Sequence, residues 1–190
     1  MANNRKQQIV DVAARLLAQK GFEGLRTREI AEIVGINHAT IHYHFKDKET
    51  LIKAVIHSTI DQIYQTDMAA FEQTLPAREK LRLVMRSNLQ QRQKHSQRFM
   101  VMGELAARAN RDANIYQVLI DLDKDLFARM QALLDDGVAS GDLRPSLNTQ
   151  AMASMLVTLL RGVPLQPPQQ TVDQFMQFYQ QIEQDMLIAK

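Results

Sequence analysis

Apolar residues recur along most of the chain at intervals of three and four positions, the spacing that places them on one face of an α-helix. The stripe formed by Ile9, Val12 and Leu16 is a typical case. We find no convincing run of alternating apolar and polar residues, the pattern of a half-buried β-strand. The pattern therefore predicts an all-α protein with about nine helices. The predicted helices lie at about residues 9–20, 28–34, 38–44, 48–63, 76–94, 99–107, 115–138, 151–163 and 172–186.

The first predicted helices begin after residues that favour N-caps and end at glycines. Thr27, Asn37 and Asp47 are residue types that cap helix N-termini, and each directly precedes a predicted helix. Gly21 and Gly35 each follow a predicted helix and can take the left-handed conformation that ends it. Three short helices therefore precede a longer fourth helix.

The helices fall into two groups by length. We predict an N-terminal three-helix domain at residues 1–47 and a C-terminal helical bundle at residues 48–190. A chain of 190 residues is long enough for one or two domains with a buried core. No metal or disulfide is needed to hold such a core together.

Composition narrows the class of protein. The chain has no cysteine, which excludes disulfide scaffolds, thiolate zinc sites and cysteine nucleophiles. The residues after Met1 lead into an amphipathic segment, unlike the apolar core of a signal peptide. The most apolar stretch, residues 151–160, is about half the length that a membrane span needs. We therefore expect a soluble, cytoplasmic protein.

Charge is distributed unevenly along the chain. The whole chain has a formal net charge of +2, but residues 1–60 hold nine lysines and arginines against six acidic residues. Four of the five histidines also lie in this part. A basic N-terminal third is compatible with a polyanionic partner such as DNA, although a solvated surface would have the same composition.

Residues 27–45 carry the pattern of a helix-turn-helix. Two short helices are joined by the turn Gly35-Ile36-Asn37, and Ala31 lies where the helices would cross. Small side chains at the crossing and a glycine in the turn allow the helices to approach closely. The second helix would then present its side chains to the major groove of DNA. A plain helical hairpin would show the same spacing.

The N-terminal region also resembles the TetR/AcrR family of bacterial transcription regulators. The resemblance covers about residues 5–55 and joins the first helix, the helix-turn-helix and the start of the fourth helix in the family's order. The matching residues are Ala14, Leu17, Gly21, Phe22, Thr27, Ile30, Ala31, Gly35, Ile36, Thr40, Ile41, His44, Phe45, Lys48 and Leu51. Beyond this region the chain matches the family in helix number and length and in a late proline-containing loop.

The resemblance implies a DNA-binding role for nine residues. Lys48 matches a phosphate-binding lysine, and Arg28 matches a position that reaches a base or a phosphate. His42 stands where the family usually has tyrosine, and the charge of an imidazole depends on pH. The implied DNA-binding residues are Thr27, Arg28, His38, Ala39, Thr40, His42, Tyr43, His44 and Lys48.

The resemblance further implies a homodimer that binds a palindromic operator and responds to a small organic ligand, most often as a repressor. The last two helices would form the dimer interface, although their apolar faces could also pack within one chain. Methionine and aromatic residues of the bundle are candidates for the wall of a ligand pocket, or for ordinary packed core. The candidates are Met85, Phe99, Met102, Tyr116, Phe127, Met130 and Met155.

Other chemistry finds little support in the sequence. His38 and His42 have a spacing that can hold a metal, but no acidic residue lies between them. The acidic run 121–125 resembles a calcium loop but lacks its glycine and its final glutamate. We therefore predict no metal, no cofactor and no enzyme activity. The alternatives are a DNA-bound structural or division-control protein without an inducer and, more remotely, a helical ligand-binding enzyme.

Overall fold

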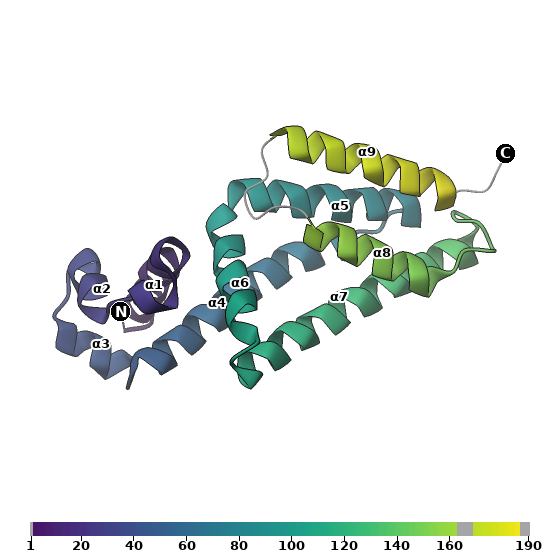
Figure 1. Ribbon diagram of the computed structural model, residues 1–190. Helices are drawn as coiled ribbons and strands as arrows, with labels where there is room; N and C mark the ends of the chain where they lie inside the picture. The colour runs from purple at the N-terminus through teal and green to yellow at the C-terminus, as the bar shows by residue number, and fades with distance from the viewer. Residues whose placement is uncertain (1, 163–168, 187–190) are drawn as a thin grey trace. The chain divides into compact units, whose positions relative to one another are not determined.

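The computed structural model describes residues 2–162 and 169–186 (Figure 1). Within these residues the chain forms nine α-helices and no β-strand, as the sequence predicts. The helices are α1 (Ala2–Gly24), α2 (Thr27–Val34), α3 (His38–His44), α4 (Lys48–Phe71), α5 (Ala77–Lys94), α6 (Ser96–Ala109), α7 (Ala113–Ser140), α8 (Thr149–Gly162) and α9 (Gln169–Met186). The predicted end of the eighth helix at Val163 and Pro164 lies outside the described residues. No helix in the described part is long and apolar enough to cross a membrane.

The helices form two compact units. The first contains the residues up to Gln65 together with Gln97–Arg108, and the second contains Thr66–Ser96 and the residues from Ala109 onward. These units do not coincide with a boundary after residue 47. The N-terminal part of α4 and most of α6 belong with α1, α2 and α3.

The core of the first unit is built from the apolar stripe predicted for α1. Ile9, Ala13 and Leu17 are completely buried. The stripe ends at Gly21, which has a φ of 67° and kinks the helix before one further turn to Gly24. Glycine suits this position because a positive φ is strained for other residues.

Two of the three predicted N-caps are present as expected, and the third is wrong. The side chain of Asn37 accepts a hydrogen bond from the backbone of Ala39 at the start of α3. The carboxylate of Asp47 accepts one from the backbone of Thr50 in α4. Thr27 does not cap α2, because the N-cap position is occupied by Arg26 and no side chain bonds there. Thr27 is instead the first residue of the helix, and its hydroxyl has another partner.

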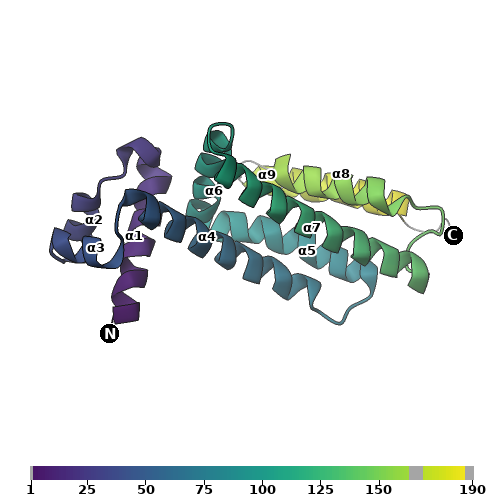
Figure 2. The same cartoon turned by 90° about the horizontal axis from the view of Figure 1, so that it is seen from below.

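The second unit has a single apolar core to which α5, α7, α8 and α9 all contribute. Figures 1 and 2 both show α7 and α8 side by side, and α7 also packs against α5. The buried side chains of this core include Leu81, Met85, Leu89, Met130, Leu134, Leu156, Phe175 and Tyr179. This core holds the helices of the second unit together.

Gly137 allows a close contact within the second unit. A side chain added at this position would come within 2.8 Å of Ala77 at the start of α5 and within 2.7 Å of Leu143. Asp142 accepts a hydrogen bond from the backbone of Ala77 at 2.9 Å. The end of α7 is therefore held tightly against the first turn of α5.

Candidate nucleic-acid interface

Apolar contacts and a left-handed glycine hold α2 and α3 together. Ile30 and Ala31 of α2 and Ile41 of α3 are almost completely buried. Gly35 has a φ of 70° and a ψ of 42°, which is the left-handed conformation expected at the end of a helix. The backbone N–H of Ile36 then donates to the carbonyl of Ala31 at 3.0 Å. The predicted helix-turn-helix is therefore formed.

The helix α3 presents an outward face. Ala39, His42 and Tyr43 are exposed, and the Tyr43 side chain is 84% accessible to solvent. His38, Thr40 and His44 are partly exposed, whereas only Ile41 is buried within the helix. This arrangement leaves one side of α3 available to a partner.

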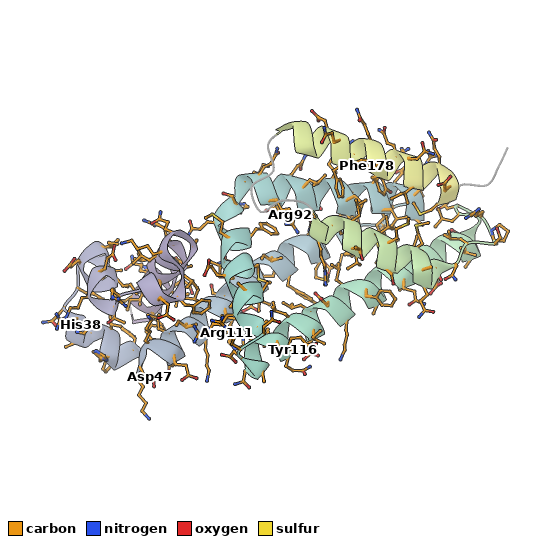
Figure 3. The ribbon with its side chains drawn as sticks, viewed as in Figure 1. His38, Asp47, Arg92, Arg111, Tyr116 and Phe178 are labelled. Carbon is orange, nitrogen blue, oxygen red and sulfur yellow. The ribbon has the colours of Figure 1, made fainter. Side chains whose placement is uncertain are left out.

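His38 is tied to the neighbouring helix. Its Nε2 atom lies 2.9 Å from the hydroxyl of Thr27, which joins the first turns of α2 and α3 (Figure 3). Its ring also contacts the ring of His42 edge-on, with 4.8 Å between the ring centroids. The rings of Tyr43 and His44 make the same kind of contact, with 5.2 Å between centroids. Thr27 and His38, both predicted to contact DNA, therefore bind each other in this structure.

Lys48 begins α4 and also has a partner. Its ammonium group donates to the backbone carbonyl of Phe22 at 2.8 Å. The preceding residue, Asp47, accepts hydrogen bonds from the backbone and hydroxyl of Thr50, and these bonds lower the pKa of its carboxyl group. Arg28 lies exposed in the first turn of α2. One ammonium proton of Lys48 is engaged, and two others remain as donors.

Metal-ligating side chains do not converge in the part of the chain that the structure describes. No group of three or more histidine, cysteine, aspartate or glutamate residues there could hold a metal ion. The rings of His38 and His42 contact each other edge-on, and the three acidic residues of the 121–125 run lie on the continuous helix α7.

The seven predicted pocket residues lie in different surroundings. Met85 and Met130 are fully buried in the core of the second unit, and Phe127 packs partly buried against that core. Tyr116 and Met155 are exposed to 52% and 51%. Two more lie on α6, which belongs mainly to the first unit: Phe99, which is buried, and Met102, which is partly exposed.

One hollow does lie between α7 and α8. It has a volume of about 320 Å³, within the range of small-molecule sites. Arg161 and Asp123 form an ion pair at its wall, and burial lowers the pKa of Arg161. The lining residues are Asp123, Lys124, Phe127, Ser154, Val157, Thr158 and Arg161. Phe127 is the one residue of the seven that lines this hollow, and the other lining residues are polar except for Val157, which is buried in the core of the second unit.

The second unit also buries charged side chains that the apolar pattern does not reveal. The carboxylate of Glu183 on α9, only 4% exposed, lies 2.6 Å from Arg82 and 3.3 Å from Arg78 of α5. The hydrogen bond to Glu183 raises the pKa of Arg82. Arg92, near the end of α5, donates to the side chain of Asn88 and to the backbone carbonyl of Leu160 in α8 (Figure 3). These bonds tie α5 to α9 and to α8.

A helix-turn-helix with an exposed second helix, followed by a helical bundle, defines a class of DNA-binding regulators. Comparison with known proteins identifies the family. Residues 9–55 match the model of the bacterial regulatory proteins of the tetR family, and residues 77–174, just over half of the chain, match that of the C-terminal part of BetI-type transcriptional repressors. Both are families of regulators rather than enzymes. The chain belongs to the TetR family of transcriptional regulators.

Individual relatives agree with this assignment. An HTH-type transcriptional regulator of Bacillus subtilis, YhgD, is 22% identical over 163 residues that cover 84% of each chain. The structure of a transcriptional regulator from Saccharomonospora viridis in complex with choline matches with a TM-score of 0.86 and 21% identity, covering 98% of this chain and 100% of the other. AibR in complex with isovaleryl coenzyme A and operator DNA matches with a TM-score of 0.70 and 19% identity, covering 92% and 97%.

The family assignment extends the resemblance that the sequence suggested. Sequence motifs reached only to about residue 55, whereas the second family match begins at Ala77 and includes α5 to α8. The chain is a ligand-responsive, DNA-binding transcriptional regulator.

Proposed function

We propose that this protein represses transcription by binding a palindromic operator as a homodimer, and that a small organic ligand releases it. The observation that carries the proposal is the outward face of α3, where Ala39, His42 and Tyr43 are exposed above the buried Ile41. A helix held in this way fits the major groove, and the groove edges of the bases are where sequence is read. Its place of action is then the bacterial cytoplasm, where the operator DNA lies.

The nine candidate DNA-binding residues divide into two groups. Ala39, Thr40 and Tyr43 project from α3 and would read bases, together with His38 at its start. Arg28, His42, His44 and Lys48 carry or can acquire positive charge and would bind phosphate. Thr27 would act through its bond to His38. The functional domains are then residues 1–47 for DNA binding and residues 48–190 for ligand binding and dimerisation.

Exposed apolar side chains on the last two helices support the homodimer. Met155 of α8 is 51% exposed and Phe178 of α9 is 64% exposed. A monomer gains nothing from such exposure, whereas a symmetric interface buries each residue twice. A twofold dimer would place its two α3 helices about 34–36 Å apart, which is one turn of DNA.

The hollow between α7 and α8 is our first candidate for the ligand site. It combines an aromatic ring, Phe127, with the hydroxyls of Ser154 and Thr158 and the charges of Asp123 and Arg161. Two of the predicted pocket residues, Met85 and Met130, lie in the same core as Val157 of the wall and would let that core adapt to a ligand. The complexes of the S. viridis regulator and AibR suggest two ligand classes to test first, quaternary ammonium compounds and acyl coenzyme A thioesters.

The proposal is tested by selecting duplexes from a random 30-base-pair pool with the full chain. We expect enrichment of a palindromic sequence that binds two chains per duplex. Choline and isovaleryl coenzyme A are then titrated against the complex, and release by either identifies a ligand. Failure to enrich any sequence would contradict the operator proposal. A palindrome insensitive to a broad ligand panel would favour a DNA-bound structural role. No catalytic step enters the proposal, and turnover of an added ligand would contradict it.

A further inference from the structure

The turn at the end of α1, residues 21–23, is held from two other helices of the same unit. From α4, the ammonium group of Lys48 donates to the carbonyl of Phe22 at 2.8 Å. From α6, the guanidinium of Arg108 lies over the ring of Phe22, 4.7 Å from its centroid. Phe22 itself is buried. One residue therefore receives a cation on each side, one at its backbone and the other at its ring.

Gly21 brings α6 still closer to this turn. A side chain at Gly21 would come within 3.1 Å of the carboxylate of Glu104, and the φ of 67° favours glycine independently of space. Glu104 and Arg108 lie one helical turn apart on α6, so the same face of α6 meets both Gly21 and Phe22. The turn is packed directly against the C-terminal half of α6.

The carbonyl of Phe22 is available to Lys48 for a structural reason. It lies in the last turn of α1, where backbone carbonyls have no acceptor role within the helix. The bond to Lys48 satisfies this carbonyl and fixes the direction of the lysine side chain at the start of α4. The ring and the carbonyl of Phe22 are both carried by the same Cα atom, so restraint of the ring limits the movement of this residue and of its carbonyl.

We propose that Arg108 is a positioning residue for operator binding, which acts on DNA through Phe22 and Lys48. By holding the Phe22 ring, Arg108 fixes the carbonyl that directs Lys48 toward a DNA phosphate. This inference rests on the proposed phosphate contact of Lys48. Arg108 lies five residues before the start of α7, the helix that supplies Asp123, Lys124 and Phe127 to the wall of the hollow.

The contact with the ring, rather than an ion pair, carries the effect of Arg108. Arg108 also lies 3.7 Å from the carboxylate of Glu23, but the Glu23 side chain is 98% exposed. An ion pair this exposed is screened by solvent and salt. A cation over a buried aromatic ring is less screened and restrains the ring directly. Glu23→Gln should therefore leave DNA binding unchanged, whereas Phe22→Leu should weaken it.

The test measures the affinity for a 30-base-pair duplex enriched by the wild-type chain, by fluorescence anisotropy between 50 and 200 mM salt. Arg108→Ala should weaken binding about three- to five-fold and reduce the salt slope by about 0.9, the value for one phosphate contact. Lys48→Ala should have at least the same effect, and the double variant should bind like Lys48→Ala alone. Arg108→Lys, which keeps a cation, should retain most of the affinity. Arg111→Ala removes an exposed arginine three positions away and should behave as wild type.

Each other outcome rejects one part of the proposal. Unchanged affinity and salt slope in Arg108→Ala would overturn it. Additive losses in the double variant would mean that Arg108 acts independently of Lys48, which also overturns it. If Arg108→Ala unfolds, Phe22→Leu provides the same test with the carbonyl retained. A Lys48→Ala variant with an unchanged salt slope would reject the phosphate contact itself, and so the proposed role of Lys48 rather than the link to Arg108.

Discussion

The hydroxyl of Thr27 and the Nε2 atom of His38 lie 2.9 Å apart, so a single side-chain hydrogen bond joins the first turns of α2 and α3. Both residues were candidates for direct contact with DNA. Their mutual bond joins the start of the recognition helix to α2. His42 and His44, by contrast, have only ring contacts among the described residues.

Thr40 and Tyr43 should decide which sequence is bound. Tyr43 is exposed and Thr40 partly exposed on α3, where side chains meet base edges. Thr40→Ala and Tyr43→Ala should each change discrimination at the contacted base pair by about 1–3 kcal/mol. Repeating the selection from the random pool with each variant measures this change. Equal weakening on every sequence would assign these residues to the backbone instead.

The helix-turn-helix could be predicted from sequence because its signals are local. Gly35 ends α2 and Asn37 caps the start of α3, and the two residues are separated by Ile36 alone. Helix ends and caps of this kind depend on residues that are neighbours in the chain, so they can be predicted without knowledge of the fold. Thr27 shows the limit, since its residue type suits an N-cap but its hydroxyl bonds to His38 in the next helix.

The ligand-binding part could not be predicted in the same way. Met155 and Tyr116 are pocket candidates by residue type, but both side chains are exposed. Residue type alone does not say which face of a helix is buried. The contact of Glu183 with Arg82 joins residues 101 positions apart and follows no spacing rule. The need for glycine at position 137 likewise cannot be predicted from the sequence, because it arises from the contact with Ala77 of α5.

Phe178 should control the oligomeric state. Placing a charge in an apolar symmetric interface costs its desolvation twice, once on each chain. Phe178→Glu should therefore shift the protein from dimer to monomer and weaken binding to a palindromic duplex. Light scattering coupled to size-exclusion chromatography measures the first effect. Leu75→Glu alters an exposed leucine outside α8 and α9 and should leave the dimer intact; a dimeric Phe178→Glu variant would contradict the proposed interface.

Tyr179 should make the second unit sensitive to alkali. Its hydroxyl is buried without a hydrogen-bond partner among the described residues. Burial, and then the charge of Glu183, raise its pKa well above the ordinary value of about 10. A raised pKa means that the folded state keeps the proton while the unfolded state releases it. Stability is therefore intact below pH 10 and falls above it, by about 1.4 kcal/mol per pH unit until the folded pKa is reached.

Tyr179→Phe tests this sign directly. Removing a buried hydroxyl without a partner should leave the free energy of unfolding at pH 7 unchanged or raise it by about 1 kcal/mol. The larger effect should come at pH 11, where the variant keeps the stability that the wild type loses. Urea unfolding at both pH values measures the difference, and Tyr116→Phe, at an exposed tyrosine, is the control. A wild type and variant that lose stability equally at pH 11 would show that another group titrates, and that the Tyr179 hydroxyl is solvated in solution.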